Sequence, residues 1–190
     1  MYVFHVAVNH GDTVALQTYT RKYWLCCVRS DSICHRETCP GMHMTGSDWT
    51  RCWGEVFQIY RASGPGQVRV GDLVGLHYPH ESGRWLGCPG SNCFKAACPG
   101  HPTTTYGFAS QEHWYWCFGE VFKVYAKGKS NGAIINAGDD IMLYYLQQQL
   151  WVDLDDGDAQ KSSCVGTIRP PPFSKFDVCS SETFTIWKNS

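Results

Sequence analysis

The side chains with the clearest capacity for chemistry in this chain are its cysteines, which number eleven in 190 residues. A thiol can bind a metal or oxidise to a disulfide, and the compartment largely decides which of the two occurs. So many cysteines in a small chain are typical of a covalent framework in an oxidising environment. We therefore predict an extracellular protein braced by disulfides, although the first ten residues show neither the basic start nor the long apolar run of a signal peptide.

The cysteines recur at matching places in three segments of the chain, and this recurrence predicts their pairing. Three equivalent bridges would each join a cysteine followed by Pro-Gly or Val-Gly to a later cysteine of the same segment: Cys39–Cys52, Cys98–Cys117 and Cys164–Cys179. The first two segments would also share a short bridge, Cys27–Cys34 and Cys88–Cys93. Cys26 is then left over, which indicates either a buried thiol or a bridge between two molecules.

Zinc binding is the competing chemistry for one of these stretches, because four ligand types lie close together at Cys34, His35, Cys39 and His43. Their spacing matches no known zinc finger. The equivalent stretch that begins at Cys93 has no histidine at its second position. We therefore favour disulfides over a metal site and expect no cofactor.

Three sets of one Asp, one Tyr and one Trp could bind a ligand. An aromatic ring can stack on the apolar face of a sugar while nearby polar side chains bind its hydroxyls. The sets are Asp12, Tyr19 and Trp24, then Asp72, Tyr78 and Trp85, and finally Asp139, Tyr145 and Trp151. The structural alternative is that each Asp hydrogen-bonds the backbone of a turn, while the Tyr and Trp close one end of a β-barrel.

Two other stretches are candidates for binding. Tyr115 and Trp116 end a long insertion and would form a surface pair suited to a glycan or a protein, or would pack against their own loop. The acidic run at residues 153–158 could hold calcium, but it lacks the distal Glu of an EF-hand loop, so we favour a solvated turn. No nucleophile elbow, zinc-protease motif, phosphate loop or dinucleotide turn is present, so we predict a binding protein and not an enzyme.

A repeating structure must position these residues, because the phrases around them occur three times at roughly 60-residue spacing. Each copy opens with Gly-Asp and alternating apolar residues, continues with Trp-Leu or Trp-Val, and closes with Phe-x-Ile or Phe-x-Val. Alternation places the apolar residues on one face of a strand, so they are the expected core. We also expect a short strand before each Gly-Asp, at residues 3–8, 67–70 and 133–135.

Three repeats of four short strands, about twelve strands in all, resemble the all-β fold of the β-trefoil. The resemblance covers nearly the whole chain and implies one disulfide-braced domain with repeats at residues 1–66, 67–132 and 133–190. The Gly-Asp-x-Val-x-Leu opening is most similar to fascin-like and MIR-type repeats, whereas the closing strands lack the Q-x-W motif of ricin-type lectins.

Many β-trefoils are lectins, so the resemblance implies a secreted and multivalent carbohydrate-binding protein, with a role in recognising surfaces or microbes as in innate immunity. The alternatives are a protein-binding trefoil, such as a protease inhibitor or a cytokine-like ligand, and a fascin-like cytoskeletal binder. The net charge of −1 argues against a nucleic-acid partner. No apolar run reaches the roughly 18 residues that a membrane span needs. The sequence leaves the sugar, the partner and the oligomeric state open.

Overall fold

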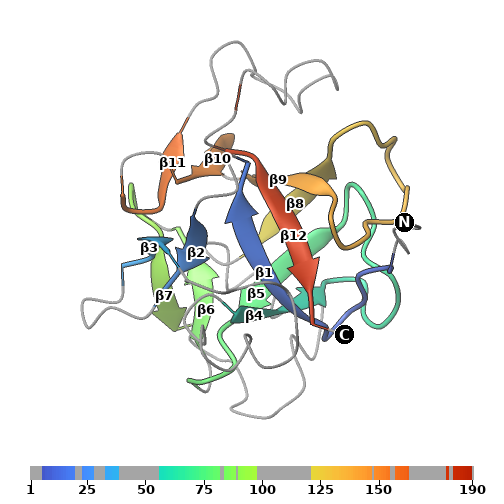
Figure 1. The fold of residues 1–190 in the computed structure, drawn as a ribbon, viewed down its shortest axis with the longest axis horizontal. Coiled ribbons are helices and arrows are strands. Elements are labelled where there is room, and N and C mark those ends of the chain that lie inside the picture. The colour runs from blue at the N-terminus through green and yellow to red at the C-terminus, as the bar shows by residue number, and fades with distance from the viewer. Residues whose placement is uncertain are drawn as a thin grey trace.

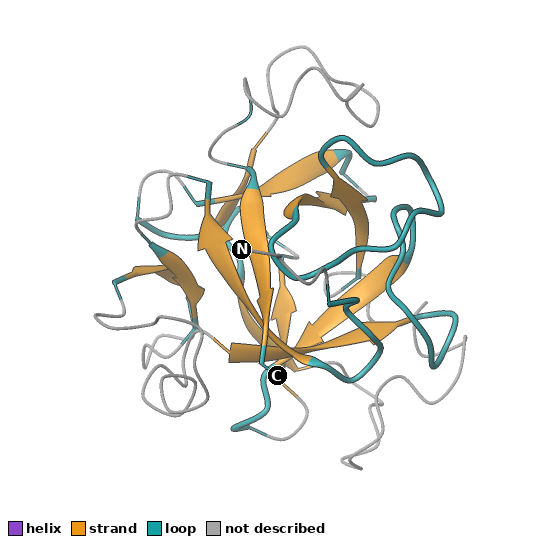
Figure 2. Ribbon diagram, turned by 45° about the vertical axis from the view of Figure 1, so that its right-hand side comes forward, coloured by secondary structure: helices purple, strands orange, loops and turns teal. Residues whose placement is uncertain are grey.

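The computed structural model describes residues 6–19, 23–27, 33–38, 56–81, 84–88, 90–97, 121–146, 148–154, 157–162, 179 and 182–189. Across these residues the regular structure consists of strands without a helix, which confirms the predicted all-β class (Figures 1 and 2). The twelve strands are β1 (Thr13–Thr18), β2 (Trp24–Cys26), β3 (His35–Glu37), β4 (Val56–Arg61), β5 (Leu73–His77), β6 (Arg84–Gly87), β7 (Phe94–Ala97), β8 (Phe122–Ala126), β9 (Asp140–Tyr145), β10 (Leu150–Asp153), β11 (Gln160–Ser162) and β12 (Phe184–Lys188).

Six of these strands close into an antiparallel barrel. Going round it, β1 pairs with β4, β4 with β5, β5 with β8, β8 with β9, β9 with β12, and β12 with β1 again. Figure 1 shows β1 and β12 side by side at this closure. The remaining strands form the hairpins β2–β3, β6–β7 and β10–β11, which attach to β1, β5 and β9. Each third of the chain therefore contributes two barrel strands and one hairpin.

Two rings of backbone hydrogen bonds tie the three repeats together. Where β1, β5 and β9 begin, Val8 N–H donates to Ile135 O at 2.9 Å, Ile135 N–H to Val68 O at 2.9 Å, and Val68 N–H to Val8 O at 2.7 Å. At the hairpins a second ring runs from Cys34 N–H to Cys93 O at 2.9 Å, from Cys93 N–H to Ala159 O at 2.7 Å, and from Ala159 N–H to Cys34 O at 2.6 Å. Each repeat donates to one neighbour and accepts from the other, which is the pattern of threefold pseudosymmetry.

The prediction of a strand before each Gly-Asp is wrong for the residues that the structure describes. Residues 7–9, 67–69 and 134–136 form isolated bridges between repeats, because each segment pairs briefly with two others before the chain turns. The turn residues Gly11, Gly71 and Gly138 have φ of 86°, 94° and 90°, where a side chain would be strained. The strand that the sequence did not reveal is instead the second strand of each hairpin, β3, β7 or β11.

The barrel interior is filled by the apolar columns that alternation predicts. All are at most 1% exposed: Val14, Leu16, Leu25, Phe57, Ile59, Val74, Leu76, Leu86, Phe122, Val124, Ile141, Leu143, Val152, Phe184 and Ile186. They belong to one continuous cluster that draws on all three repeats. The repeats are therefore parts of a shared core, since a single four-stranded unit leaves its apolar face uncovered.

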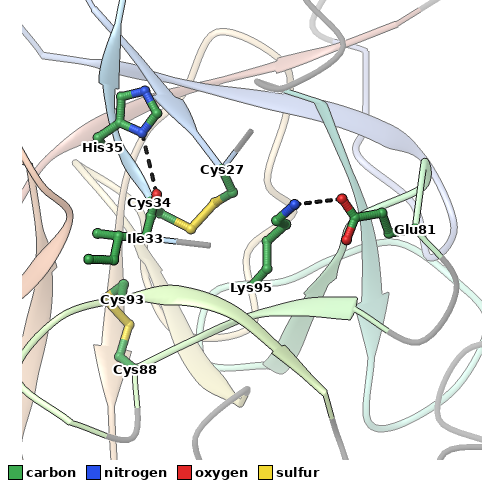
Figure 3. Close-up of a disulfide and its surroundings, with 8 residues drawn as sticks. All are labelled: Cys27, Ile33, Cys34, His35, Glu81, Cys88, Cys93 and Lys95. Atoms are coloured by element: carbon green, nitrogen blue, oxygen red, sulfur yellow. Dashed lines mark hydrogen bonds and ion pairs between the residues drawn. A yellow bond between two sulfur atoms is a disulfide. The ribbon is translucent and has the colours of Figure 1, made fainter. Parts of the chain in front are cut away.

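Both short disulfides predicted from the sequence, Cys27–Cys34 and Cys88–Cys93, are present and lie near each other in the hairpin region (Figure 3). Cys179 is also in a disulfide, and its predicted partner Cys164 lies outside the described residues. The predicted bridges Cys39–Cys52 and Cys98–Cys117 lie outside them as well. Cys26 keeps its thiol and is buried, so this structure does not offer the thiol to a second molecule.

The third repeat replaces the short disulfide by an apolar pair. Leu154 follows Trp151 by three residues, as Cys27 follows Trp24 and Cys88 follows Trp85. Its counterpart Ala159 occupies the place of Cys34 and Cys93 in the hydrogen-bond ring. Both residues are buried in the shared core.

We expect that a third short disulfide can be built at this place. The double variant Leu154→Cys/Ala159→Cys should raise the free energy of unfolding by about 2 kcal/mol, because the new loop has the same five-residue separation as the loop of Cys88–Cys93. Denaturant unfolding of the oxidised variant, with thiol titration to verify bridge formation, measures the effect. The two single variants serve as controls. A formed bridge that leaves stability unchanged would contradict the threefold equivalence of these positions.

Candidate functional site

The Asp of each predicted binding set serves the turn in which it lies. The Oδ2 atoms of Asp12, Asp72 and Asp139 accept the backbone N–H three residues earlier, at 2.6, 2.8 and 2.7 Å respectively. Each carboxylate also pairs with a cation: Lys188 Nζ lies 2.7 Å from Asp12, Arg61 Nε lies 2.7 Å from Asp72, and Lys129 pairs with Asp139. These contacts match the turn-capping alternative.

We expect Asp72→Asn to lower the free energy of unfolding by about 1–2 kcal/mol, because the amide keeps an acceptor oxygen but loses the charge that binds Arg61. Urea unfolding near neutral pH measures this loss. Asp72→Ala is the companion variant and should cost more, since it also removes the acceptor for Arg69 N–H. Equal stability of all three proteins would show that the carboxylate does not hold the turn.

Two of the three predicted tyrosines belong to the core. Tyr78 and Tyr145 are buried, and their rings lie 6.4 Å from Phe57 and 6.3 Å from Phe122. Lys95 Nζ lies 5.1 Å from the centre of the Tyr78 ring and 2.5 Å from Glu81 Oε1 (Figure 3). The two rings are therefore enclosed and do not face a ligand on the barrel surface.

Tyr19 lies one residue beyond the place that Tyr78 and Tyr145 share. Thr18 occupies that place, as the register shows: Gln17 is opposite Trp24 just as His77 is opposite Trp85. The Tyr19 ring therefore has a different environment, is partly exposed, and lies 5.1 Å from Lys127 Nζ. Tyr19 is therefore not equivalent to the two core tyrosines, and the place predicted for it is shifted by one residue.

The three tryptophans of the sets do occupy equivalent places, each in a cluster on the outer wall of the barrel. In the second repeat, Trp85 lies 4.9 Å from His77 and 5.5 Å from Tyr60 between ring centres. In the third, Trp151 lies 4.7 Å from Tyr144 and 5.8 Å from Tyr125.

The cluster of the first repeat follows the same plan with a polar member. Trp24 is opposite Gln17 on β1, and Gln17 Oε1 accepts the Nε1–H of Trp187 at 3.0 Å. We call these three groups the outer clusters: Tyr60, His77 and Trp85; Tyr125, Tyr144 and Trp151; Trp187, Gln17 and Trp24. Each joins a β-hairpin to two neighbouring barrel strands.

Within the outer clusters the predicted tryptophans are buried, as are Tyr60 and Tyr144. Trp24, Trp85 and Trp151 are 3%, 2% and 0% exposed, and Cys179 packs with Trp151 in one buried group. The partly exposed aromatic members are His77, Tyr125 and Trp187. Tyr125 and Trp187 were missed as candidates, although an aromatic residue follows Phe-x-Ile or Phe-x-Val in all three repeats.

The Asp and the Trp of each predicted set do not meet. Asp12 precedes β1 and Trp24 is opposite Gln17 near its far end, and five residues of extended strand span about 17 Å. The same register separates Asp72 from Trp85. The structure therefore places each tryptophan beside the other residues of its outer cluster, and it places the carboxylates at the other end of the barrel.

Burial fixes the protonation of the ring groups in the outer clusters. It raises the pKa of Tyr60 and of Tyr144 above the ordinary tyrosine value. Burial together with the neighbouring Tyr144 raises the pKa of Tyr125 to about 12. The phenols therefore keep their protons near neutral pH and can donate hydrogen bonds.

The zinc alternative loses its first ligand, because Cys34 is bonded to Cys27. The buried His35 ring has contacts of its own: Nε2 lies 3.2 Å from Glu37 Oε2, and Nδ1 lies 3.4 Å from Ile33 O. Within the described ranges no group of three His, Cys, Asp or Glu side chains is arranged to hold a metal ion. The other two proposed ligands, at positions 39 and 43, lie outside those ranges.

The remaining sequence candidates are described in part. In the acidic run, Asp153 is buried and Asp158 is exposed, so these two carboxylates do not share one environment. Its two middle residues, and also Tyr115 and Trp116, lie outside the described residues. In the portion of the chain that is described, no helix has the length and apolar character needed to cross a bilayer.

Comparison with known proteins finds similarity in fold. An SDF2-like protein from Arabidopsis thaliana matches with a TM-score of 0.57 at 14% identity, over 95% of this chain and 94% of its own. A Caenorhabditis elegans protein of unknown function gives a TM-score of 0.60 at 12% identity, with both chains fully covered. An arabinofuranosidase complexed with arabinofuranosyl-alpha-1,2-xylobiose gives 0.58 at 11% identity, over 98% of this chain and 33% of that enzyme.

No protein-family model matches the sequence, and no curated protein matches it significantly. At these identities the structural matches show the fold alone. Together with the pairing of its strands, they define the class of this chain: an all-β protein with a closed six-stranded barrel, three attached hairpins and disulfides.

Proposed function

We propose that the chain is a single β-trefoil domain, secreted, that binds carbohydrate without catalysing a reaction. The threefold arrangement of two barrel strands and one hairpin per repeat supports the trefoil assignment. The two cyclic hydrogen-bond rings support it independently, because each joins all three repeats in a closed cycle. The donors run from repeat one to three to two in the first ring and from one to two to three in the second. The disulfides favour the secretory pathway, since cytosolic proteins rarely keep such bonds.

The observation that carries the binding proposal is the outer clusters and their partly exposed rings. Sugars bind to flat aromatic surfaces that have polar groups beside them, in shallow sites. Trp187 has Gln17 beside it, and Tyr125 has Lys123 Nζ 5.7 Å from its ring centre. In this proposal the sugar stacks on Tyr125 and on Trp187.

The predicted tryptophans keep a role in this site as its buried base. Trp151 touches Tyr125 and fixes the orientation of that ring. Trp24 is the buried tryptophan of the cluster in which Trp187 is the partly exposed one. Repeat-related sites on one rigid body would gain avidity without any new contact. The structure of the arabinofuranosidase with a bound arabinofuranosyl oligosaccharide concerns that enzyme, and it supports the proposal here only through the shared fold.

A glycan array with the oxidised protein tests the proposal. We expect binding that falls at least about tenfold, or 1.4 kcal/mol, in Trp187→Leu and Tyr125→Leu, which keep apolar bulk but lose the flat ring. Tyr23→Leu is the matched control, because Tyr23 is also partly exposed but lies outside the outer clusters, beside Arg36. Circular dichroism must show that every variant is folded.

Two results would count against this function. A silent array from folded wild-type protein would move the assignment to a protein partner, which pull-down from extracellular fluid would then identify. Binding that is unchanged in both ring variants would remove the outer clusters as its site, and would direct attention to Tyr115 and Trp116.

A further inference from the structure

Two histidines flank Tyr60 where the first repeat meets the second. The His10 ring lies 5.1 Å from the Tyr60 ring between ring centres, and the His77 ring lies 6.1 Å from it. Tyr60 is the penultimate residue of β4, and His77 is the last residue of β5, the next barrel strand. The two histidines thus take part in the same packing between neighbouring repeats.

The contacts of His10 require its neutral form. Its Nδ1 accepts the backbone N–H of Arg61 at 3.1 Å, and a protonated ring has no lone pair for this bond. Protonation would also place a positive charge beside the Arg61 guanidinium, which binds Asp72 at 2.7 Å. Burial and the charge of Arg61 accordingly lower the pKa of His10 below 6.5.

His77 is neutral for a related reason. Its ring packs against Trp85 at 4.9 Å and Tyr60, and its Nδ1 is buried with no hydrogen-bond partner within the described part of the chain. Protonation would put a positive charge on a ring whose Nδ1 is out of contact with water, so burial lowers the pKa of His77 below 6.5.

This pair of histidines is found at one of the three contacts between neighbouring repeats. The places equivalent to His77 hold Gln17 and Tyr144, and the places equivalent to His10 hold Val70 and Ala137. Two neutral histidines within one packed group therefore occur only at the contact between repeats one and two, as far as the chain is described.

We propose that His10, Tyr60 and His77 form an acid-sensitive junction, which holds the first two repeats together at neutral pH and loosens when the histidines gain protons. Among the residues that the structure describes, the titratable and charged groups around it are few. Tyr60 and Arg61 face His10 from β4, Asp72 lies beyond Arg61, and Asp12 of the segment that carries His10 is paired with Lys188 of β12.

Among the described residues, no carboxylate is paired with His77. Tyr60 faces it from β4 and Trp85 from β6. On the β8 side of β5, Lys123 is opposite Leu73, four residues along the strand from His77. The positive charge that each histidine gains on protonation would therefore lie beside a cationic or an aromatic neighbour: Arg61 for His10, and Tyr60 and Trp85 for His77.

The direction of the pH effect follows from these positions. In the unfolded chain a histidine titrates near 6.5, while His10 and His77 in the folded protein bind protons only at lower pH. The unfolded state therefore binds more protons as the pH falls below about 6.5, and this favours unfolding. The stabilisation is complete above that pH and is lost as the pH falls through the folded-state values.

Unfolding in urea at pH 7.5 and 5.5 tests the proposal, since an ordinary Asp, with a pKa of about 3.9, stays ionised in this range. We expect the wild type to lose stability at pH 5.5. His10→Asn, which retains an acceptor, and His77→Gln, which copies the first repeat, should each lose less, and the double variant least. His80→Gln is the matched control, because His80 also contacts a tyrosine but is exposed, so it should lose as much as the wild type.

An NMR titration of the wild-type histidines keeps the test decisive if a variant fails to fold. Both His10 and His77 should titrate below 6.5. Values at or above 6.5 for both would overturn the proposal, as would a wild-type stability that does not change between the two pH values. A double variant that loses as much stability as the wild type would overturn it too.

Discussion

Replacing Trp151 by alanine is expected to lower the free energy of unfolding by about 3–5 kcal/mol, the range found when a buried large aromatic is truncated. The Trp151 side chain is fully buried, contacts Tyr125 and Tyr144, and packs with Cys179 of a disulfide. Its removal would leave a cavity between the third hairpin and the barrel wall. Urea unfolding followed by far-UV circular dichroism measures the loss.

Two further variants make this result interpretable. Trp151→Phe should cost less than half as much as alanine, because the phenyl ring fills part of the space. Trp187→Ala, at a partly exposed ring of another outer cluster, should also cost less than Trp151→Ala. A Trp151→Ala protein within about 1 kcal/mol of the wild type would contradict the burial of this residue.

This expectation also limits which variants can locate a ligand site. A Trp24→Ala, Trp85→Ala or Trp151→Ala protein that fails to bind a glycan could have lost its fold instead of a contact. The partly exposed rings of Tyr125 and Trp187 avoid that ambiguity, which is why the binding test uses them.

The second large effect is expected at the short disulfides. Cys88→Ala/Cys93→Ala should lower the free energy of unfolding by about 2–4 kcal/mol, mainly because the unfolded chain loses a constraint. Both half-cystines are fully buried in the shared core, so the lost sulfur atoms add a packing cost. Chemical denaturation of the purified variant measures the sum.

The third repeat supplies a matched control for this experiment. Cys88→Leu/Cys93→Ala reproduces the pair Leu154 and Ala159, so it removes the covalent bond but restores apolar volume. It should be more stable than the double alanine variant and less stable than the wild type. If it equals the wild type, the covalent bond adds nothing measurable to stability at this place.

The sequence predicts the core well because each position is represented three times. Val14, Val74 and Ile141 occupy the same place after a Gly-Asp turn. An apolar residue that occurs in one repeat by chance can therefore be recognised, because the other two repeats lack it. The short bridges were predictable for the same reason, since Cys27–Cys34 and Cys88–Cys93 repeat each other.

The hairpin strands and the ligand sets were harder to predict, for different physical reasons. β3 and β11 hold only three residues each, so period-two alternation has too little length to appear. The ligand sets failed to converge because Asp12 and Trp24 are near opposite ends of a strand, a separation that depends on register. The partners of each tryptophan come from the barrel strands beside its hairpin, as Trp85 of β6 meets His77 on β5 and Tyr60 on β4.

Native-state hydrogen exchange tests most directly the claim that three equivalent repeats form one closed β-trefoil. The amide protons of both rings should be among the slowest to exchange, and should do so through global unfolding: Val8, Val68, Ile135, Cys34, Cys93 and Ala159. Similar protection of all six would support the account. Rapid exchange of the members from one repeat, with the other two protected, would contradict it.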